Sequence, residues 1–179
     1  RLQVFSCPVG RISCQWQSKS AYPNTYGERG VMASQQQGQG GSLRIIGGQW
    51  RGRKLSFTAA EGLRPTSDRI RETLFNWLAP DLPDSRCLDL YAGSGALGLE
   101  ALSRGAAQCV FVDNSAAAIS DINQHLQTLD SDQGETVQSP ATRFLQQQPT
   151  GASAFDIAFL DPPFADGLLA SSCEELERA

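Results

Sequence analysis

The sequence has few of the residues that metal sites and disulfide frameworks require. Its single histidine is His125, and its five cysteines include no C-x-x-C pair. Because a zinc site needs several nitrogen or sulfur ligands at short spacing, no metal site is expected. The odd cysteine count, with two cysteines inside apolar runs, predicts buried, reduced thiols. His125 lies in a polar helical stretch and is expected at the surface.

Long apolar runs are absent as well. No segment has the roughly 20 apolar residues of a membrane-spanning helix, and the N-terminus lacks the apolar stretch of a signal peptide. Hydrophobic residues make up 40% of the 179 positions, which is ordinary for one domain with a sizeable core. We therefore expect a soluble, cytoplasmic protein without membrane contacts. We also expect a monomer.

Methionine occurs once, at Met32, within an N-terminal segment unlike the rest of the chain. Residues 1–42 are rich in Gln, Ser and Gly and end in ASQQQGQGGS, a composition typical of low-complexity linkers. We interpret Met32 as the natural start and residues 1–42 as a disordered extension. A basic β-hairpin at residues 43–60 and an α/β domain at residues 61–179 are expected to follow.

Charge is distributed unevenly along the chain. Residues 43–71 carry a formal charge of +5 and residues 72–179 carry −12. A basic segment on an acidic body favours a polyanionic partner bound by one face, although a solvated surface is the simpler alternative. We expect the hairpin to protrude beside the catalytic pocket. The residues expected to bind a nucleic-acid backbone are Arg44, Arg51, Arg53, Lys54 and Arg64.

A helix is predicted between the hairpin and the first strand of the α/β domain. Thr66 or Ser67 can cap its start, and Pro80 ends it. The helical spacing of the apolar residues predicts that one face packs on the core. That face would carry Ile70, Leu74, Trp77 and Leu78.

Strand and helix patterns then alternate. Strands are expected at residues 87–90, 109–112, 136–138 and 157–160. Helices are expected in ALGLEALSRG, at residues 116–129, in a short segment ending near Gln147 and again from about Leu168. This alternation predicts an α/β fold with a Rossmann-like, doubly wound and mostly parallel sheet. Ligands of such sheets bind beyond the carboxyl ends of the strands.

Two strand ends carry the signature of a nucleoside-binding site. Gly93, Gly95 and Gly98 form a G-x-G-x-x-G between a strand and a helix. Asp113 ends the second strand, 20 positions after Gly93, where a carboxylate commonly binds a ribose diol. The alternative for Asp113 is a solvated acid that caps the next helix.

The third strand end, Asp161-Pro162-Pro163-Phe164, is unusual for a scaffold. The two prolines make the turn rigid and remove two N–H donors. The Asp161 carboxylate and the Pro162 carbonyl can then accept both hydrogens of an exocyclic amine. Phe164 offers a flat face on which a base can stack. Such acceptors would localise the lone pair of an aromatic amine and prepare it to attack a methyl group.

At these residues the sequence resembles the class I S-adenosylmethionine-dependent methyltransferases. DLYAGSG is similar to their cofactor loop, and DPPF to the [DN]-PP-[FY] motif of enzymes that methylate exocyclic amines. RIIGGQWRGRKL, LRPTSDRIRETLFNWL and CLDLYAGSGALGLEALSRGA resemble the bacterial 16S ribosomal RNA (guanine-N2)-methyltransferases. The resemblance runs from about Leu43 to Leu169.

The resemblance implies S-adenosylmethionine as cofactor and small-subunit ribosomal RNA as partner. It implies cofactor contacts from Asp89, Tyr91, Gly93, Gly95, Asp113, Asn114 and Ala141, and base handling by Asp161, Pro162, Pro163 and Phe164. Relatives often carry an acid in the loop at residues 139–142, where this chain has Ser-Pro-Ala-Thr. We therefore expect an amide N–H or a hydroxyl to make the adenine contact there.

The family's sheet has seven strands, and only four are expected here. We therefore expect an incomplete methyltransferase domain, with the strand at 157–160 left as an unpaired edge. Two alternatives stay open. An NAD-dependent oxidoreductase would use the glycine turn and Asp113, and a non-catalytic RNA-binding fragment would use the basic segment.

Overall fold

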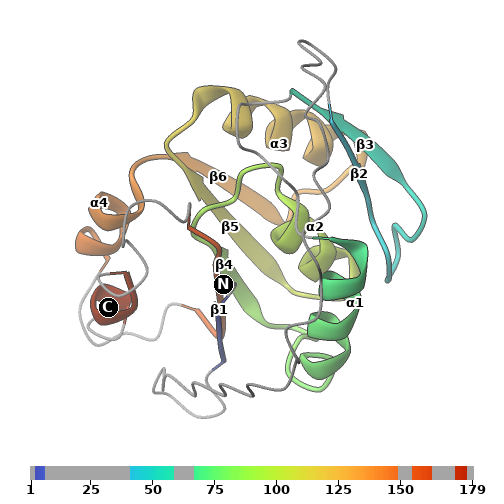
Figure 1. Cartoon of the computed structure of the whole chain (residues 1–179), viewed down its shortest axis with the longest axis horizontal. Coiled ribbons are helices and arrows are strands. Elements are labelled where there is room, and N and C mark those ends of the chain that lie inside the picture. Colours follow the sequence, from blue (N-terminus) through green and yellow to red (C-terminus); the bar gives the residue numbers. More distant parts are fainter. Residues whose placement is uncertain (1–2, 7–40, 59–66, 149–154, 163–171, 177–179) are drawn as a thin grey trace, which may run out of the picture.

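The computed structural model describes residues 3–6, 41–58, 67–148, 155–162 and 172–176. Its centre is a five-stranded sheet in the order β1-β7-β4-β5-β6, beside a two-stranded hairpin (Figure 1). The sheet strands are β1 (Gln3–Ser6), β4 (Arg86–Asp89), β5 (Gln108–Asp113), β6 (Gly134–Gln138) and β7 (Ile157–Leu160). The hairpin is β2 (Gly41–Arg44) and β3 (Lys54–Phe57), and the helices are α1 (Asp68–Trp77), α2 (Ala96–Ser103), α3 (Ala116–Thr128) and α4 (Ala141–Gln146).

The four parallel strands that the sequence predicts are all present, so the α/β fold is confirmed. The chain passes from β4 to β5 to β6 on one side and then crosses back to place β7 on the other side of β4. The order therefore reverses between β4 and β7. In open α/β sheets the crevice beyond the carboxyl ends of the strands at such a reversal is the usual ligand site.

Two cores cover the two faces of the sheet, because successive strand residues point to opposite sides. Cys87, Phe111 and Phe159 face the core formed with α1, α2, α3 and the hairpin. Leu88 and Val112 face the smaller core formed with α4 and residues 172–176. Figure 1 shows α4 apart from α1 and the hairpin. Within the described segments, no helix is long and apolar enough to span a membrane.

The expected inner face of α1 is confirmed for Leu78, which is buried, and for Leu74, which packs against the core, but it is wrong for Ile70 and Trp77. Ile70 is 54% exposed and Trp77 is 75% exposed, whereas Arg71 and Phe75 are buried together with Leu78. These three buried residues are spaced for one helical face. The prediction failed because it excluded a charged residue from the core, and Arg71 is buried there with acidic partners. Ser67 occupies the N-cap position, as expected, without a side-chain capping bond.

The free edge expected at β7 is also wrong. β1 pairs with β7 in antiparallel register, from Gln3 opposite Leu160 to Ser6 opposite Ile157. Residues 3–6 and 41–42 therefore belong to strands, although the sequence assigns both to a disordered extension. The start expected at Met32 lies outside the described residues.

The hairpin packs flat on the domain and shares its main core. Leu43, Leu55 and Phe57 are buried, while the alternating neighbours face solvent. His125 of α3 is buried beneath it, with Nε2 3.0 Å from the Ser56 carbonyl oxygen. The expectation of a surface histidine is therefore wrong. The hairpin covers this part of α3. The polar sequence around His125 indicates an exposed helix and contains no sign of this long-range contact. Cys87 and Cys109 are buried free thiols, as expected.

Gly48 gives a stability prediction with an internal control. It has φ +73°, and a Cβ there would lie 1.7 Å from the Ser103 carbonyl oxygen. Gly52 has φ +83° with nothing within 4 Å of such a Cβ. Gly48→Ala is expected to lower the free energy of unfolding by roughly 2–4 kcal/mol, because backbone strain and a backbone clash combine. Gly52→Ala, with strain alone, should lose about 1 kcal/mol. Urea unfolding measures both, and equal losses would contradict the packing described here.

Candidate active site

Three carboxylates lie at the carboxyl ends of the strands beside the order reversal. Asp89 is the last residue of β4, Asp113 is the last residue of β5, and Asp161 follows β7 directly. Asp89 is paired in register with Phe111 of β5 and Phe159 of β7. Asp113 and Asp161 therefore each lie two residues further along, about 7 Å beyond Asp89 in the strand direction. The three acids therefore lie at the carboxyl ends of neighbouring strands, on the edge of the sheet where ligands of such folds usually bind.

The glycine turn leads from β4 into α2. Gly93 and Gly95 have φ +51° and +76°, a region that only glycine occupies readily. Gly95 is also the N-cap of α2. The turn is therefore tight, and it exposes no side chain at the two glycines that the sequence singles out.

Asp113 anchors this turn. One carboxylate oxygen accepts a hydrogen bond from the Gly93 N–H at 2.8 Å, and the other accepts one from the Ser115 N–H at 2.8 Å. Asp113 therefore links the ends of β4 and β5. Each carboxylate oxygen has lone-pair capacity for a second donor, so Asp113 can still accept hydrogen bonds from a diol.

Asp89 is nearly inaccessible, with 2% of its surface exposed, and accepts a hydrogen bond from the Gly98 N–H at 2.9 Å. Burial raises its pKa from 3.8 to about 7. The hydrogen bond from Gly98 opposes that rise, and the charges of Asp161 and Asp113 add to it. The Asp161 and Asp113 carboxylates therefore lie close enough to Asp89 to affect its ionisation. A cation in the crevice would favour the ionised form of Asp89.

The pKa of Asp89 gives a testable dependence of stability on pH. Because the folded pKa is raised, this group's contribution to stability falls as the pH rises from about 4 to about 7. Asp89→Asn keeps the acceptor for Gly98 and removes the titration. The variant's unfolding free energy relative to wild type should therefore rise by roughly 2–3 kcal/mol between pH 5 and pH 8. Denaturant unfolding at both pH values measures this, with the exposed Asp81→Asn as control. A difference that does not change with pH would contradict it.

The other expected cofactor residues lie around the same strand ends. Asn114 is exposed directly after β5, and Ala141 is buried as the first residue of α4. Tyr91 is half-buried against the smaller core, and its hydroxyl lies 2.6 Å from the Ser172 hydroxyl. The Tyr91 hydroxyl therefore connects the cofactor loop to residues 172–176. Cofactor contacts by these three residues remain predictions.

The turn after β7 is described only in its first half. Asp161 is half-buried and Pro162 is buried. Pro163 and Phe164 lie outside the described residues, so the stacking role expected of Phe164 stays a prediction. The acid and the first proline lie at the carboxyl end of β7, next to β4, as the sequence predicts.

The basic residues do not lie where the sequence places them. Arg51, Arg53 and Lys54 are exposed, but the hairpin turn lies against the last residue of α2, where the Gln49 N–H donates to the Ser103 carbonyl at 2.7 Å. The glycine turn is at the first residue of that helix, about 12 Å away along its axis. The expected hairpin beside the catalytic pocket is therefore wrong in position.

The charge of the basic segment is also partly neutralised. Arg44 is exposed and forms an ion pair with Asp68 at 3.0 Å, and Arg71 is buried. Arg64 lies outside the described residues. The described cations of this segment that face solvent are Arg44, Arg51, Arg53, Lys54 and Arg69.

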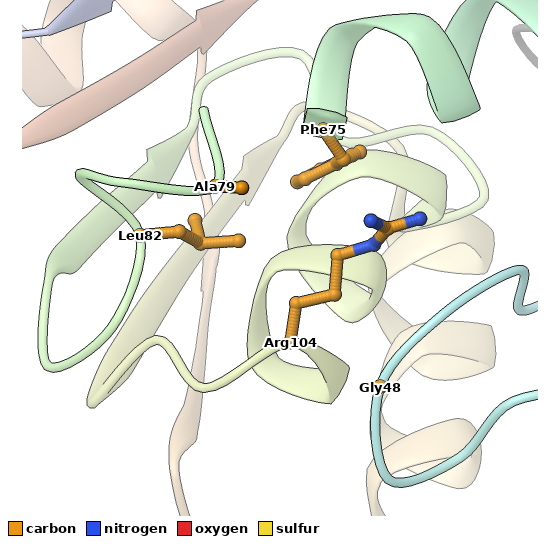
Figure 2. A pocket seen from close by; sticks show the side chains of 5 residues that line it. All are labelled: Gly48, Phe75, Ala79, Leu82 and Arg104. Atoms are coloured by element: carbon orange, nitrogen blue, oxygen red, sulfur yellow. The ribbon is translucent and has the colours of Figure 1, made fainter. Parts of the chain in front are cut away.

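A pocket of about 250 Å³ lies away from the carboxylates, under the hairpin turn (Figure 2). Its walls come from the turn, the end of α1, the loop after α1 and the residue after α2. They are Gly48, Phe75, Ala79, Leu82 and Arg104. None of these residues lies at the carboxyl end of a strand, so the pocket is separate from the strand-end crevice.

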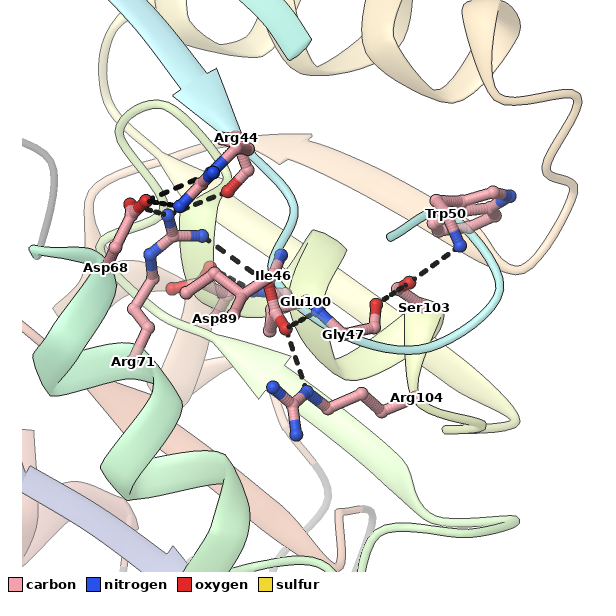
Figure 3. A network of polar contacts seen from close by, with 11 residues as sticks. Arg44, Ile46, Gly47, Trp50, Asp68, Arg71, Asp89, Glu100, Ser103 and Arg104 are labelled. Carbon is pink, nitrogen blue, oxygen red and sulfur yellow. Dashed lines mark hydrogen bonds and ion pairs between the residues drawn. The ribbon is translucent and has the colours of Figure 1, made fainter. Parts of the chain in front are cut away.

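Sequence reasoning missed a polar network that joins the hairpin to α1 and α2 (Figure 3). Its centre is Glu100, which is fully buried in α2 and contacts Arg71 and Arg104. The signal in the sequence is a lone acid inside the apolar run ALGLEALS. Buried charges are normally paired, so such an acid predicts cationic partners elsewhere in the chain.

The comparisons with known proteins agree with this geometry. The family model Conserved hypothetical protein 95 matches residues 43–179. The chain is 52% identical over 137 residues to the ribosomal RNA small subunit methyltransferase D of Escherichia coli K12, covering 76% of this chain and 68% of that protein. The Haemophilus influenzae protein of the same name is 50% identical over 126 residues, covering 69% of this chain and 65% of that protein.

Solved structures show the same relationship. The Escherichia coli protein yhhF superposes with a TM-score of 0.67 at 51% identity, covering 76% of this chain and 73% of that chain. With the glycine turn, the strand-end acids and all but the first two residues of the hairpin inside the matched region, the chain belongs to the Conserved hypothetical protein 95 family, together with the ribosomal RNA small subunit methyltransferase D proteins.

Proposed function

We propose that this protein transfers a methyl group from S-adenosylmethionine to the exocyclic N2 amine of a guanine in 16S ribosomal RNA. The observation that carries the proposal is the convergence of the glycine turn, Asp113 and Asp161-Pro162 at the order reversal of the sheet. Membership in a methyltransferase family supports the reaction class. The same membership disfavours an NAD-dependent oxidoreductase. That alternative also gives Asp161 and Pro162 no role. The substrate would place the protein in the cytoplasm.

The residues at the crevice fit this cofactor. Gly93 and Gly95 leave bare backbone beside the strand ends, and Asp113 keeps acceptor capacity for a ribose diol. The Asp113 and Asp161 carboxylates make these strand ends acidic, which suits a sulfonium cation. When bound, the cofactor supplies an electrophilic methyl group.

Asp161 and Pro162 are proposed to hold the amine. The carboxylate of Asp161 and the carbonyl of Pro162 would each accept one N–H, which orients the nitrogen and localises its lone pair. Asp161 lies two residues after Phe159, which pairs with Asp89 across the sheet. The amine and the cofactor would therefore occupy neighbouring strand ends. Positioning and electrostatics then account for catalysis, without a covalent intermediate on the protein.

The experiment that tests the function is methyl transfer to small ribosomal subunits from cells that lack the enzyme. Labelled S-adenosylmethionine supplies the methyl group, and nucleoside mass spectrometry identifies the product. N2-methylguanosine is the expected product. Label incorporation into another base would refute the proposed substrate while keeping the reaction class. No incorporation would refute the enzyme and leave the non-catalytic RNA-binding alternative standing.

The exposed cations of the hairpin turn should make the RNA affinity depend on salt. Replacing Arg51, Arg53 and Lys54 together with alanine should flatten the slope of log affinity against log salt by roughly two units, because each phosphate neutralised contributes about 0.7 on single strands. Cofactor affinity should not change, because these residues lie at the far end of α2 from the glycine turn. RNA titrations at several salt concentrations measure the slope. Equal slopes would place the RNA elsewhere on the protein.

A further inference from the structure

The carboxylate of Glu100 is a buried charge that contacts four partners among the described residues. It lies in α2 with no exposed surface. One oxygen accepts from the Ile46 N–H at 2.9 Å, and the other accepts from the Gly47 N–H at 2.8 Å. Two consecutive backbone N–H groups of the hairpin turn are therefore held by one side chain, which lies more than 50 residues away in the sequence.

Two arginines compensate the charge of Glu100. Arg104 Nε donates to it at 2.8 Å, and a nitrogen of the buried Arg71 lies 3.5 Å away. Arg71 also pairs with Asp68 at 2.7 Å, and Asp68 pairs with the exposed Arg44 at 3.0 Å. Figure 3 shows this row of alternating charges, which runs from the hairpin through α1 to the end of α2. Arg71 also donates to the Arg44 carbonyl at 2.8 Å, so the backbone of β2 is held too.

Ser103 fixes the rest of the turn. Its hydroxyl donates to the Gly47 carbonyl at 2.6 Å and accepts from the Trp50 N–H at 3.0 Å. A Cβ on Gly47 would lie 2.6 Å from the Arg104 guanidinium, and one on Gly48 would meet the Ser103 carbonyl. The two glycines therefore permit the close approach of the turn to α2.

We propose that Glu100 is a positioning residue, which sets where the basic hairpin turn lies relative to the cofactor loop. The inference rests on the proposed function, since it assumes that the turn binds RNA. The physical basis is that α2 is one rigid rod. Its first turn follows Gly95 of the glycine turn, and its last turn holds residues 46–50 through Glu100 and Ser103.

The surroundings of Glu100 show what its loss would do. Without the carboxylate, the N–H groups of Ile46 and Gly47 lose their acceptor, and Arg71 keeps a charge in the core. The Arg104 side chain lines the pocket of Figure 2, and its guanidinium packs 5.3 Å from the centre of the Phe75 ring. It therefore has space to turn away once its partner Glu100 is neutralised. The cofactor loop at the other end of α2 keeps its own bonds to Asp113 and Asp89.

The test is steady-state methyl transfer to small ribosomal subunits by wild type and Glu100→Gln. Glu135→Gln is the matched control, because Glu135 is an exposed acid on β6 and the change in charge is the same. Glu100→Gln should raise the KM for subunits about tenfold, while kcat and the Kd for S-adenosylmethionine stay within a few fold. The control should change none of the three. A role in stability alone would not move KM separately from kcat.

Ser103→Ala keeps the experiment decisive if Glu100→Gln fails to fold. It releases the same turn without leaving a buried charge unpaired, so it should raise the same KM by a smaller factor. A wild-type protein that transfers no methyl group would refute the proposed function. An active wild type, with the KM of Glu100→Gln or Ser103→Ala equal to that of Glu135→Gln, would refute the positioning role. A parallel loss of cofactor affinity would refute it as well.

Discussion

Asp161→Ala is expected to reduce methyl transfer by roughly 10²–10³-fold, the cost of losing one group that stabilises a developing charge. Asp161 lies at the carboxyl end of β7, beside β4. Without its carboxylate, the target amine would lose one of two acceptors, and its lone pair would stay delocalised in the ring. Cofactor affinity should remain within a few fold, because the glycine turn and Asp113 keep their own hydrogen bonds.

Single-turnover rates with saturating cofactor measure this effect on the chemical step. Asp161→Asn is the informative second variant, because its amide oxygen still accepts one N–H while its charge is gone. It should retain part of the activity. Normal methylation by Asp161→Ala would show that the amine is held by other residues.

Asp113→Ala is expected to weaken S-adenosylmethionine binding by roughly 1–3 kcal/mol, the cost of lost hydrogen bonds to a charged group. That corresponds to about 5- to 150-fold in Kd. Its carboxylate has two functions here, because it holds the Gly93 and Ser115 N–H groups and can accept from the ribose. The variant should therefore also loosen the glycine turn.

Isothermal titration calorimetry gives the cofactor affinity directly. Asp121→Ala is a suitable control, because this acid lies in α3 and bonds to Thr58, away from the strand ends. It should bind the cofactor like the wild type. An unchanged Kd for Asp113→Ala would remove the ribose role and leave Asp113 as a structural link between β4 and β5.

Local sequence patterns predicted the four parallel strands well. β7 has the bounds expected for it, and β4, β5 and α3 differ by one or two residues, because apolar runs and N-cap residues mark them locally. The proximity of the glycine turn to Asp113 could also be predicted. Asp113 ends β5, 20 positions after Gly93, and in a tight βαβ unit this spacing brings the ends of two adjacent strands together. The bond between Gly93 and Asp113 confirms that they meet.

The failures arise where a long-range partner changes what a residue prefers. The apolar spacing leaves the charged Arg71 out of the predicted inner face of α1, yet Asp68 and Glu100 allow its burial. The inner face of α1 rotates accordingly, which exposes Ile70 and Trp77. The position of the hairpin depends on the bonds of Glu100 across more than 50 residues, and no local pattern contains them. The pairing of β1 with β7 joins residues more than 150 positions apart and was equally out of reach.

The two acids at the strand ends are proposed to have separate roles. Asp113 binds the cofactor, and Asp161 holds the target amine. The most direct test measures cofactor affinity and single-turnover methyl transfer on the same preparations of wild type, Asp113→Ala and Asp161→Ala. Asp113→Ala should lose cofactor affinity and recover much of its methyl-transfer rate at saturating cofactor. Asp161→Ala should keep its affinity and lose its rate at every cofactor concentration. Two variants that lose affinity and rate in parallel would contradict this division.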